Sequence, residues 1–156
     1  MPAVNIDLTF MHRAVELALA AESNGNLPIG AVIVLDGAVI AESGNRTFVP
    51  HFHPGRHAET SALERVDPAL WARRGEMACY STLEPCLMCT GALVLHQVGA
   101  VFFGARDLQG GAQSVLVNLP PYYQVPAWVG PLLPEICDPL YERARLRFES
   151  VHSRQI

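Results

Sequence analysis

One histidine and a closely spaced cysteine pair constrain this chain most. Cys86 and Cys89 follow Pro85 three residues apart, and an earlier segment reads His57-Ala58-Glu59. Because three steps of about 100° return to nearly the same helix face, both sulfurs can reach one ion. A predicted helix start favours thiolates, since free N–H groups and the positive end of the helix dipole lie there. Two thiolates and one imidazole suit Zn²⁺, and three protein ligands leave a fourth tetrahedral position open, as in catalytic sites.

Glu59 lies two residues beyond the histidine of this set. On a regular helix the side chains of His57 and Glu59 would diverge by about 200°. In the turn before a helix the backbone is not yet helical, so both side chains can face one cavity. We therefore expect Glu59 beside the ion without ligating it, where a proton shuttle belongs.

Two other uses of the cysteine pair have less support. A thioredoxin-like redox pair normally follows the first strand of its sheet, whereas this pair follows the third predicted strand. A structural four-cysteine zinc site needs a second pair, but Cys79 and Cys137 are isolated in the sequence. We expect Cys79 in the core of a strand and Cys137 to be inert beside the last helix.

Hydrophobic periodicity and turn signals predict helices alternating with strands. Such a pattern is typical of an α/β domain in which helices cover a mixed sheet. Asp36-Gly37 predicts a hairpin turn, and Asp138-Pro139 predicts the start of the last helix. The expected helices are 7–24, 57–66, 85–96 and 138–148, and the expected strands are 31–35, 38–41, 77–83, 98–104 and one within 125–133.

Length and composition indicate a single ordinary domain, residues 1–156, with a normal core. Half of the residues are hydrophobic and 17% are charged, which excludes a disordered chain. No apolar run reaches the roughly 18 residues of a membrane span. The N-terminus lacks the basic start and apolar centre of a leader, so we expect a cytoplasmic protein. The eleven basic residues are all arginine, which excludes Schiff-base chemistry and a P-loop lysine.

The combined pattern, His-x-Glu followed by Pro-Cys-x-x-Cys, resembles the cytidine/deoxycytidylate deaminase superfamily. The resemblance extends over about 11–107, and within the superfamily it is similar to bacterial tRNA adenosine deaminases and guanine deaminases. It implies a three-layer α/β/α cytidine-deaminase-like fold with a mixed sheet of about five strands. The segments that carry it are 27–32, 44–46, 81–86 and 103–107, while 88–92 is also similar to fungal cytosine deaminases.

The resemblance also implies roles for individual residues. One Zn²⁺ per chain would be held by His57, Cys86 and Cys89, and Glu59 would move protons between water, the ring nitrogen and the departing ammonia. Asn45 matches a residue that hydrogen-bonds the base, although a turn residue after Gly44 is the alternative. The remaining substrate-binding candidates are the backbone N–H groups of Ala58 and Cys86, and the side chains of Asp107, Tyr122 and Tyr123.

The substrate prediction depends on two departures from the tRNA-acting relatives. Their basic C-terminal helix is matched by a stretch, 135–156, with four arginines and four acidic residues. Their short turn is matched by 113–128, which is rich in proline and aromatic residues and which we expect to close over a small ligand. The net charge of −4 points the same way. These features favour hydrolytic deamination of a free purine base or nucleoside, of the guanine type.

Three alternatives stay open. A-to-I editing of tRNA is the second hypothesis, and a cytosine or cytidine substrate is the third. The non-enzymatic alternative is a catalytically silent zinc-binding domain, which the presence of Glu59 disfavours. The resemblance further suggests a homodimer; no membrane partner is expected.

Overall fold

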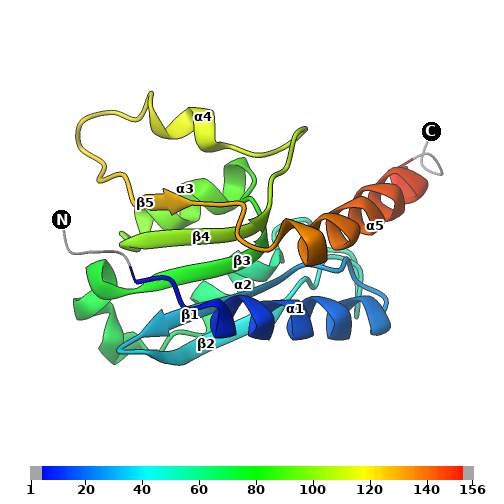
Figure 1. Cartoon of the computed structure of the whole chain (residues 1–156), viewed down its shortest axis with the longest axis horizontal. Helices are drawn as coiled ribbons and strands as arrows, with labels where there is room; N and C mark the ends of the chain where they lie inside the picture. Colours follow the sequence, from blue (N-terminus) through cyan, green and yellow to red (C-terminus); the bar gives the residue numbers. More distant parts are fainter. Residues whose placement is uncertain (1–4, 153–156) are drawn as a thin grey trace.

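The computed structural model describes residues 5–152 (Figure 1). Residues 1–4, on which part of the leader prediction rests, and 153–156 lie outside the described residues. The helices are α1 (Leu8–Ser23), α2 (Ala58–Glu64), the 3₁₀ helix η1 (Pro68–Glu76), α3 (Leu87–Leu95), α4 (Gln113–Leu116) and α5 (Pro134–His152), and the strands are β1 (Gly30–Leu35), β2 (Ala38–Gly44), β3 (Ala78–Leu83), β4 (Ala100–Ala105) and β5 (Ala127–Val129).

The five strands form one mixed sheet in the order β2-β1-β3-β4-β5. β1 pairs antiparallel with both β2 and β3, whereas β3, β4 and β5 run parallel. Helix α3 makes the crossover between the parallel strands β3 and β4, which is the usual connection for such a pair. The predicted mixed five-stranded sheet is confirmed.

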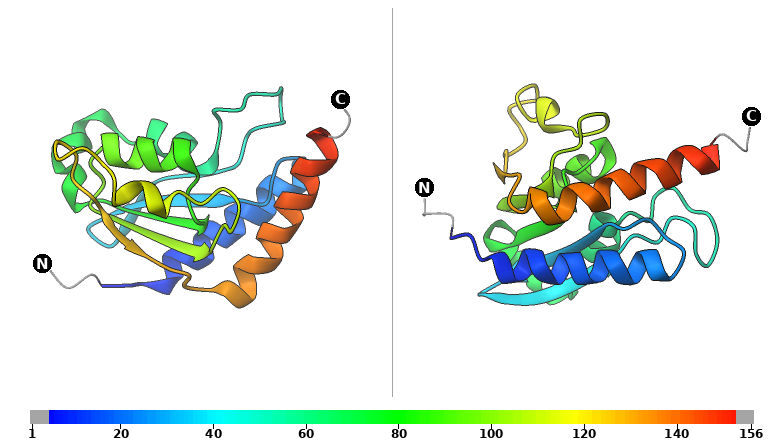
Figure 2. Two further views of the ribbon diagram at one scale, coloured as in Figure 1. Left: turned by 90° about the horizontal axis from the view of Figure 1, so that it is seen from above. Right: turned by 45° about the vertical axis from the view of Figure 1, so that its right-hand side comes forward.

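Helices cover both faces of the sheet, which gives the predicted three layers (Figures 1 and 2). Side chains alternate along each strand, so Ile33 and Cys79 pack against α2 and α3, while Val32 and Tyr80 pack against α1 and α5. Strand β1 is buried along its whole length because helices cover both of its faces. Cys79 is a core residue, as expected.

Local chemistry explains where the first elements begin and turn. The Asp7 carboxylate accepts a hydrogen bond from the Thr9 amide (2.9 Å) and so caps α1. Asp36 and Gly37 both have positive φ, 53° and 72°, as a two-residue hairpin turn of type I′ requires. Both features agree with the sequence analysis.

The prediction that the last helix begins at Asp138-Pro139 is wrong. α5 begins at Pro134, one turn earlier, and contains Pro139. Pro134 satisfies the same signal, because proline fits the first turn of a helix. The added turn places Cys137 against β4, where an added Cβ on Gly104 would come within 2.3 Å of the Cys137 sulfur. Cys137 is therefore a buried packing residue within the helix.

Helix η1 was not expected from the sequence. It begins after Asp67, whose side chain accepts from the Ala69 amide at 2.9 Å, so the Asp67-Pro68 pair starts a helix. Among residues 5–152 there is no helix with the length and apolar character needed to span a bilayer.

Candidate active site

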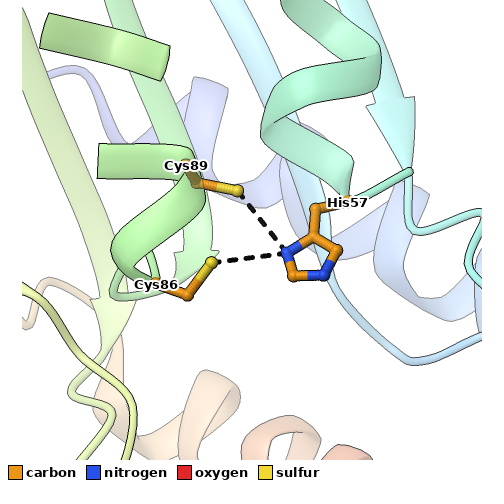
Figure 3. Close-up of side chains that lie close together, drawn as sticks. All are labelled: His57, Cys86 and Cys89. Atoms are coloured by element: carbon orange, nitrogen blue, oxygen red, sulfur yellow. Dashed lines mark hydrogen bonds between the residues drawn. The ribbon is translucent and has the colours of Figure 1, made fainter. Parts of the chain in front are cut away.

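The histidine and the two cysteines come together at the starts of two neighbouring helices. His57 is the N-cap of α2, Cys86 is the N-cap of α3, and Cys89 lies in the first turn of α3. Figure 3 shows both sulfurs facing the Nδ1 atom of His57, at 3.4 Å for Cys86 and 3.5 Å for Cys89. All three donor atoms lie within 4.8 Å of one another.

These distances fit a zinc ion. With Zn–S bonds of about 2.3 Å and Zn–N bonds of about 2.0–2.1 Å, tetrahedral angles place sulfur and nitrogen about 3.5–3.6 Å apart. The observed separations of 3.4 and 3.5 Å therefore leave room for one ion bound by all three residues. Three ligands leave a fourth position for water or substrate, which is typical of catalytic zinc sites.

The protein also prepares one of the sulfurs as a metal ligand. A hydrogen bond from the Cys89 thiol, opposed by burial and assisted by His57, lowers the pKa of Cys86 to about 4. A thiolate is therefore available at neutral pH, and thiolate is the form that binds metal. The same hydrogen bond, together with burial, raises the pKa of the Cys89 thiol, so the thiolate expected at the start of α3 is favoured for Cys86 alone until a metal ion binds.

Glu59 lies beside this cluster on the first turn of α2. Its side chain is buried, and its Oε1 atom accepts a hydrogen bond from the Ser81 hydroxyl at 2.9 Å. Burial raises the pKa of the Glu59 carboxyl group. The extended backbone of His57 (φ −73°, ψ 165°) lets both side chains face the same cavity, as the sequence analysis predicts.

A cavity of about 500 Å³ opens over His57 and Glu59. This volume lies within the range of small-molecule sites, about 300–1,000 Å³. The predicted residues that line it are Asn45, His57, Ala58, Glu59, Cys86 and Asp107. Ala58 is the first residue of α2, so its N–H group has no intrahelical acceptor and is available to a ligand.

Asn45 serves the structure of its loop as well as the cavity. Its Oδ1 atom accepts from the amides of Leu27 (3.3 Å) and Thr47 (3.1 Å), and its Nδ2 atom donates to the Thr47 hydroxyl (3.0 Å). One of the two Nδ2 hydrogens is thus left for a ligand. Asn45 is both the turn residue and a wall of the cavity, which joins the two alternatives that the sequence left open.

Asp107 stabilises the wall of the cavity that is formed by the segment after β4 and by α5. One carboxylate oxygen accepts from the amides of Gln109 (3.0 Å) and Gly110 (2.9 Å) and from the Tyr141 hydroxyl (2.9 Å). These bonds connect the end of β4 to α5. The side chain therefore positions the wall, and its other oxygen is the one that can meet a ligand.

Tyr122 and Tyr123 do not line the catalytic cavity, and Tyr122 is 85% exposed. The expectation that 113–128 closes over the ligand therefore fails within this chain. Strand β5 pairs with β4 at the edge of the sheet, and the loop with α4 before it extends beyond that edge (Figure 1). No residue of 113–128 is among those that line the cavity. The neighbouring residues that do line the cavity are Asp107, Gln109 and Gly110.

The sequence analysis missed the contribution of α5. Tyr141, Ala144, Arg145 and Phe148 line the cavity from this helix. Their spacing of three, four and seven residues is typical of one helix face, so this signal was available in the sequence.

The N-terminal two-thirds of the chain match a known family. Residues 4–105 match the family described as the cytidine and deoxycytidylate deaminase zinc-binding region. The tRNA-specific adenosine deaminase of Bacillus subtilis (strain 168) is 42% identical over 114 residues, which cover 72% of this chain and 70% of that protein. This chain belongs to the cytidine and deoxycytidylate deaminase family. It is a zinc-dependent hydrolase of the nucleobase and nucleoside deaminase type.

Three further comparisons bear on the substrate of this deaminase. The guanine deaminase of Bacillus subtilis (strain 168) is 40% identical over 100 residues, covering 63% of this chain and 64% of that protein. A solved structure from a study of tRNA:A34 deaminases and A-to-I editing has a TM-score of 0.77 and 33% identity, and the match covers 86% of this chain and 99% of that one. The solved guanine deaminase from Bacillus subtilis has a TM-score of 0.60 and 30% identity, with 89% and 94% covered.

Removing a ligand tests the metal centre of this deaminase. We expect Cys89→Ser to bind zinc at least about 100-fold more weakly, because even loss of an outer partner costs about 10–100-fold in metal affinity. Metal analysis after dialysis against a chelator measures this loss. Cys79→Ala removes a buried thiol outside the cluster and should keep one zinc per chain. Equal zinc retention in both variants would exclude Cys89 as a ligand.

Proposed function

We propose that this deaminase converts adenosine to inosine within a tRNA anticodon loop. The observation that carries the proposal is the similarity to tRNA-acting relatives, with 42% sequence identity in one and a structural match covering 99% of another. The guanine-type hypothesis relied on the charge balance and on 113–128 closing over the ligand, and no residue of that segment lines the cavity. The alternative of the sequence analysis thus has the better support.

The mouth of the cavity also suits a base that belongs to a loop. Phe52 and Phe148 line it and are 56% and 44% exposed. Aromatic side chains at such a position stack on unpaired bases, which is how proteins commonly hold single-stranded RNA.

Different residues of the chain serve metal binding, proton transfer and binding of the base in the proposed deamination. Zinc, when bound, supplies a Lewis acid that makes water nucleophilic at neutral pH. Glu59 accepts a proton from the attacking water and delivers protons to the ring nitrogen and the departing amine. Asn45, with its remaining amide hydrogen, and the Ala58 N–H orient the base, while Asp107 and the Cys86 N–H complete the polar contacts.

An assay of two substrate classes in parallel, an RNA stem-loop and free bases or nucleosides, tests the proposal. The zinc-loaded protein should produce inosine in an anticodon stem-loop and release little ammonia from free guanine, guanosine, adenine, adenosine, cytosine or cytidine. Nucleoside analysis of the RNA and an ammonia assay measure the two outcomes. Turnover of guanine without inosine formation in the stem-loop would instead support the guanine-type function. The 40% identity to a guanine deaminase is the observation that favours this second candidate.

Assembly and location complete the proposal. The homodimer implied by the resemblance stays a prediction, which sedimentation of the purified protein can test. We place the enzyme in the cytoplasm, where tRNA substrates and a reducing environment for Cys86 and Cys89 coincide. Residues 1–156 would act as one deaminase domain.

A further inference from the structure

Two arginines differ from the others in the hydrogen-bond partners of their side chains. Of the ten arginines within residues 5–152, eight donate to a carboxylate, a side-chain amide or a backbone carbonyl: Arg13, Arg65, Arg73, Arg74, Arg106, Arg143, Arg145 and Arg147. Within the same residues the Arg46 guanidinium has no such partner, and Arg56 reaches only the His51 ring, at 3.5 Å. Two positive charges are therefore left uncompensated.

Both arginines line one polar cavity of about 320 Å³. The Arg46 amide donates to the Arg56 carbonyl at 2.9 Å, which places the two residues side by side at the base of their loop. The other lining residues are His53, Gly55, Thr60, Ser61 and Glu64. Glu64 contributes one carboxylate, so the two guanidinium groups leave the cavity with a net positive charge even when His53 is neutral.

This polar cavity adjoins the catalytic one along the chain. Asn45 and Thr47 line the catalytic cavity, and Arg46 between them lines the polar cavity. Arg56 likewise immediately precedes the zinc ligand His57. Both arginines are thus direct chain neighbours of residues that line the catalytic cavity, so the two cavities share the segments 45–47 and 56–57.

The described arginines of α5 already have partners within the protein, including Arg145, which lines the catalytic cavity. Arg143 is paired with Glu22, and Arg145 with Glu142 and Glu149. Arg147 donates to the Gly25 carbonyl at 2.7 Å. Arg145 is paired within the helix, whereas Arg143 and Arg147 tie the helix to the end of α1 and the turn after it. Arginines without such partners are better candidates for phosphate contacts.

We propose that Arg46 and Arg56 form an anion site that binds a backbone phosphate next to the adenosine held in the catalytic cavity. The proposal rests on the proposed tRNA function and names the contact that the RNA makes outside the base pocket. Two planar guanidinium groups present forked N–H donors, which match the oxygens of a phosphate ester.

The double variant Arg46→Gln/Arg56→Gln tests the site. Made in a Glu59→Gln background so that substrate is not consumed, it should weaken binding of an anticodon stem-loop at least about tenfold. The slope of log K against log salt concentration should fall by about 0.7–1, as for one lost phosphate contact. The same double variant with Glu59 intact should keep its zinc content and any slow turnover of free adenosine.

Arg65→Gln is the matched control, because Arg65 ends α2 and lines neither cavity. Its stem-loop affinity and salt slope should equal those of the parent. If the parent edits the stem-loop and the double variant binds it as tightly as Arg65→Gln, the anion site is overturned while the tRNA function stands.

A second arm keeps the two proposals distinguishable. If the parent does not edit the stem-loop, the tRNA function fails, and inorganic phosphate becomes the probe. Phosphate that raises the unfolding temperature of the parent and of Arg65→Gln, but not of the double variant, supports an anion site that serves a free nucleotide. No phosphate effect on any of the three overturns the anion site as well.

Discussion

Replacing Glu59 with glutamine should lower kcat by about 10²–10⁴-fold, the range that a positioned acid–base group contributes. The amide keeps the size and the hydrogen-bonding shape of the buried carboxyl group but cannot move a proton. Zinc content should stay at one per chain, because His57, Cys86 and Cys89 supply the ligand atoms without Glu59. Deaminase turnover and metal analysis on the same sample measure both effects.

The control for this variant is Glu135→Gln, which changes an exposed carboxylate at the start of α5, outside the catalytic cavity. Its kcat should equal that of the parent. Unchanged turnover in Glu59→Gln with zinc retained would remove Glu59 from the mechanism. Loss of zinc together with activity would show that the carboxyl group holds the metal site in place.

A second large effect is expected from adding one methyl group at the contact between α1 and β1. A Cβ on Gly30 would lie 2.0 Å from the Ala14 carbonyl oxygen and 2.7 Å from the Ala18 nitrogen. Both are backbone atoms of α1, so the helix itself must move. We expect Gly30→Ala to lower the free energy of unfolding by at least about 3 kcal/mol, the upper end of ordinary overpacking costs.

Urea unfolding followed by circular dichroism measures this destabilisation. Gly75→Ala is the control, because a Cβ there would meet no atom within 4 Å and its φ is not positive. Its unfolding midpoint should stay close to that of the parent. Similar midpoints for the two variants would mean that α1 can move away from β1 at little cost.

The zinc ligands were predictable because their signal is local and chemical. Cys86, Cys89 and His57 are residue types with few other uses at helix starts, and the structure brings them to within metal-binding distance. The sheet was predictable for a related reason, since the apolar runs of β1, β3 and β4 carry their own periodicity. In each case short segments carried the signal, and for the zinc site two such segments, 29 residues apart at His57 and Cys86, had to be combined.

The walls of the cavity were harder to predict because they depend on where distant segments lie. The aromatic segment 113–128 was expected to cover the ligand, but it does not line the cavity. Helix α5 lines the cavity instead, through residues that include Tyr141 and Phe148. The aromatic segment runs into β5, whose three residues pair with β4 at the sheet edge. Such a short strand has too little pattern to reveal its partner, and neither segment shows its destination in its composition.

The attachment of α5 has a consequence for how the enzyme is made. Its ties to Glu22 and Gly25 span 121 and 122 residues of sequence, among the longest connections within residues 5–152. Chains fold as they emerge from the ribosome, N-terminal part first. A nascent chain therefore carries all three zinc ligands while the wall bearing Tyr141 and Phe148 is still to be synthesised. The part of the cavity wall formed by α5 is thus the last to be synthesised, after all three zinc ligands and the other walls.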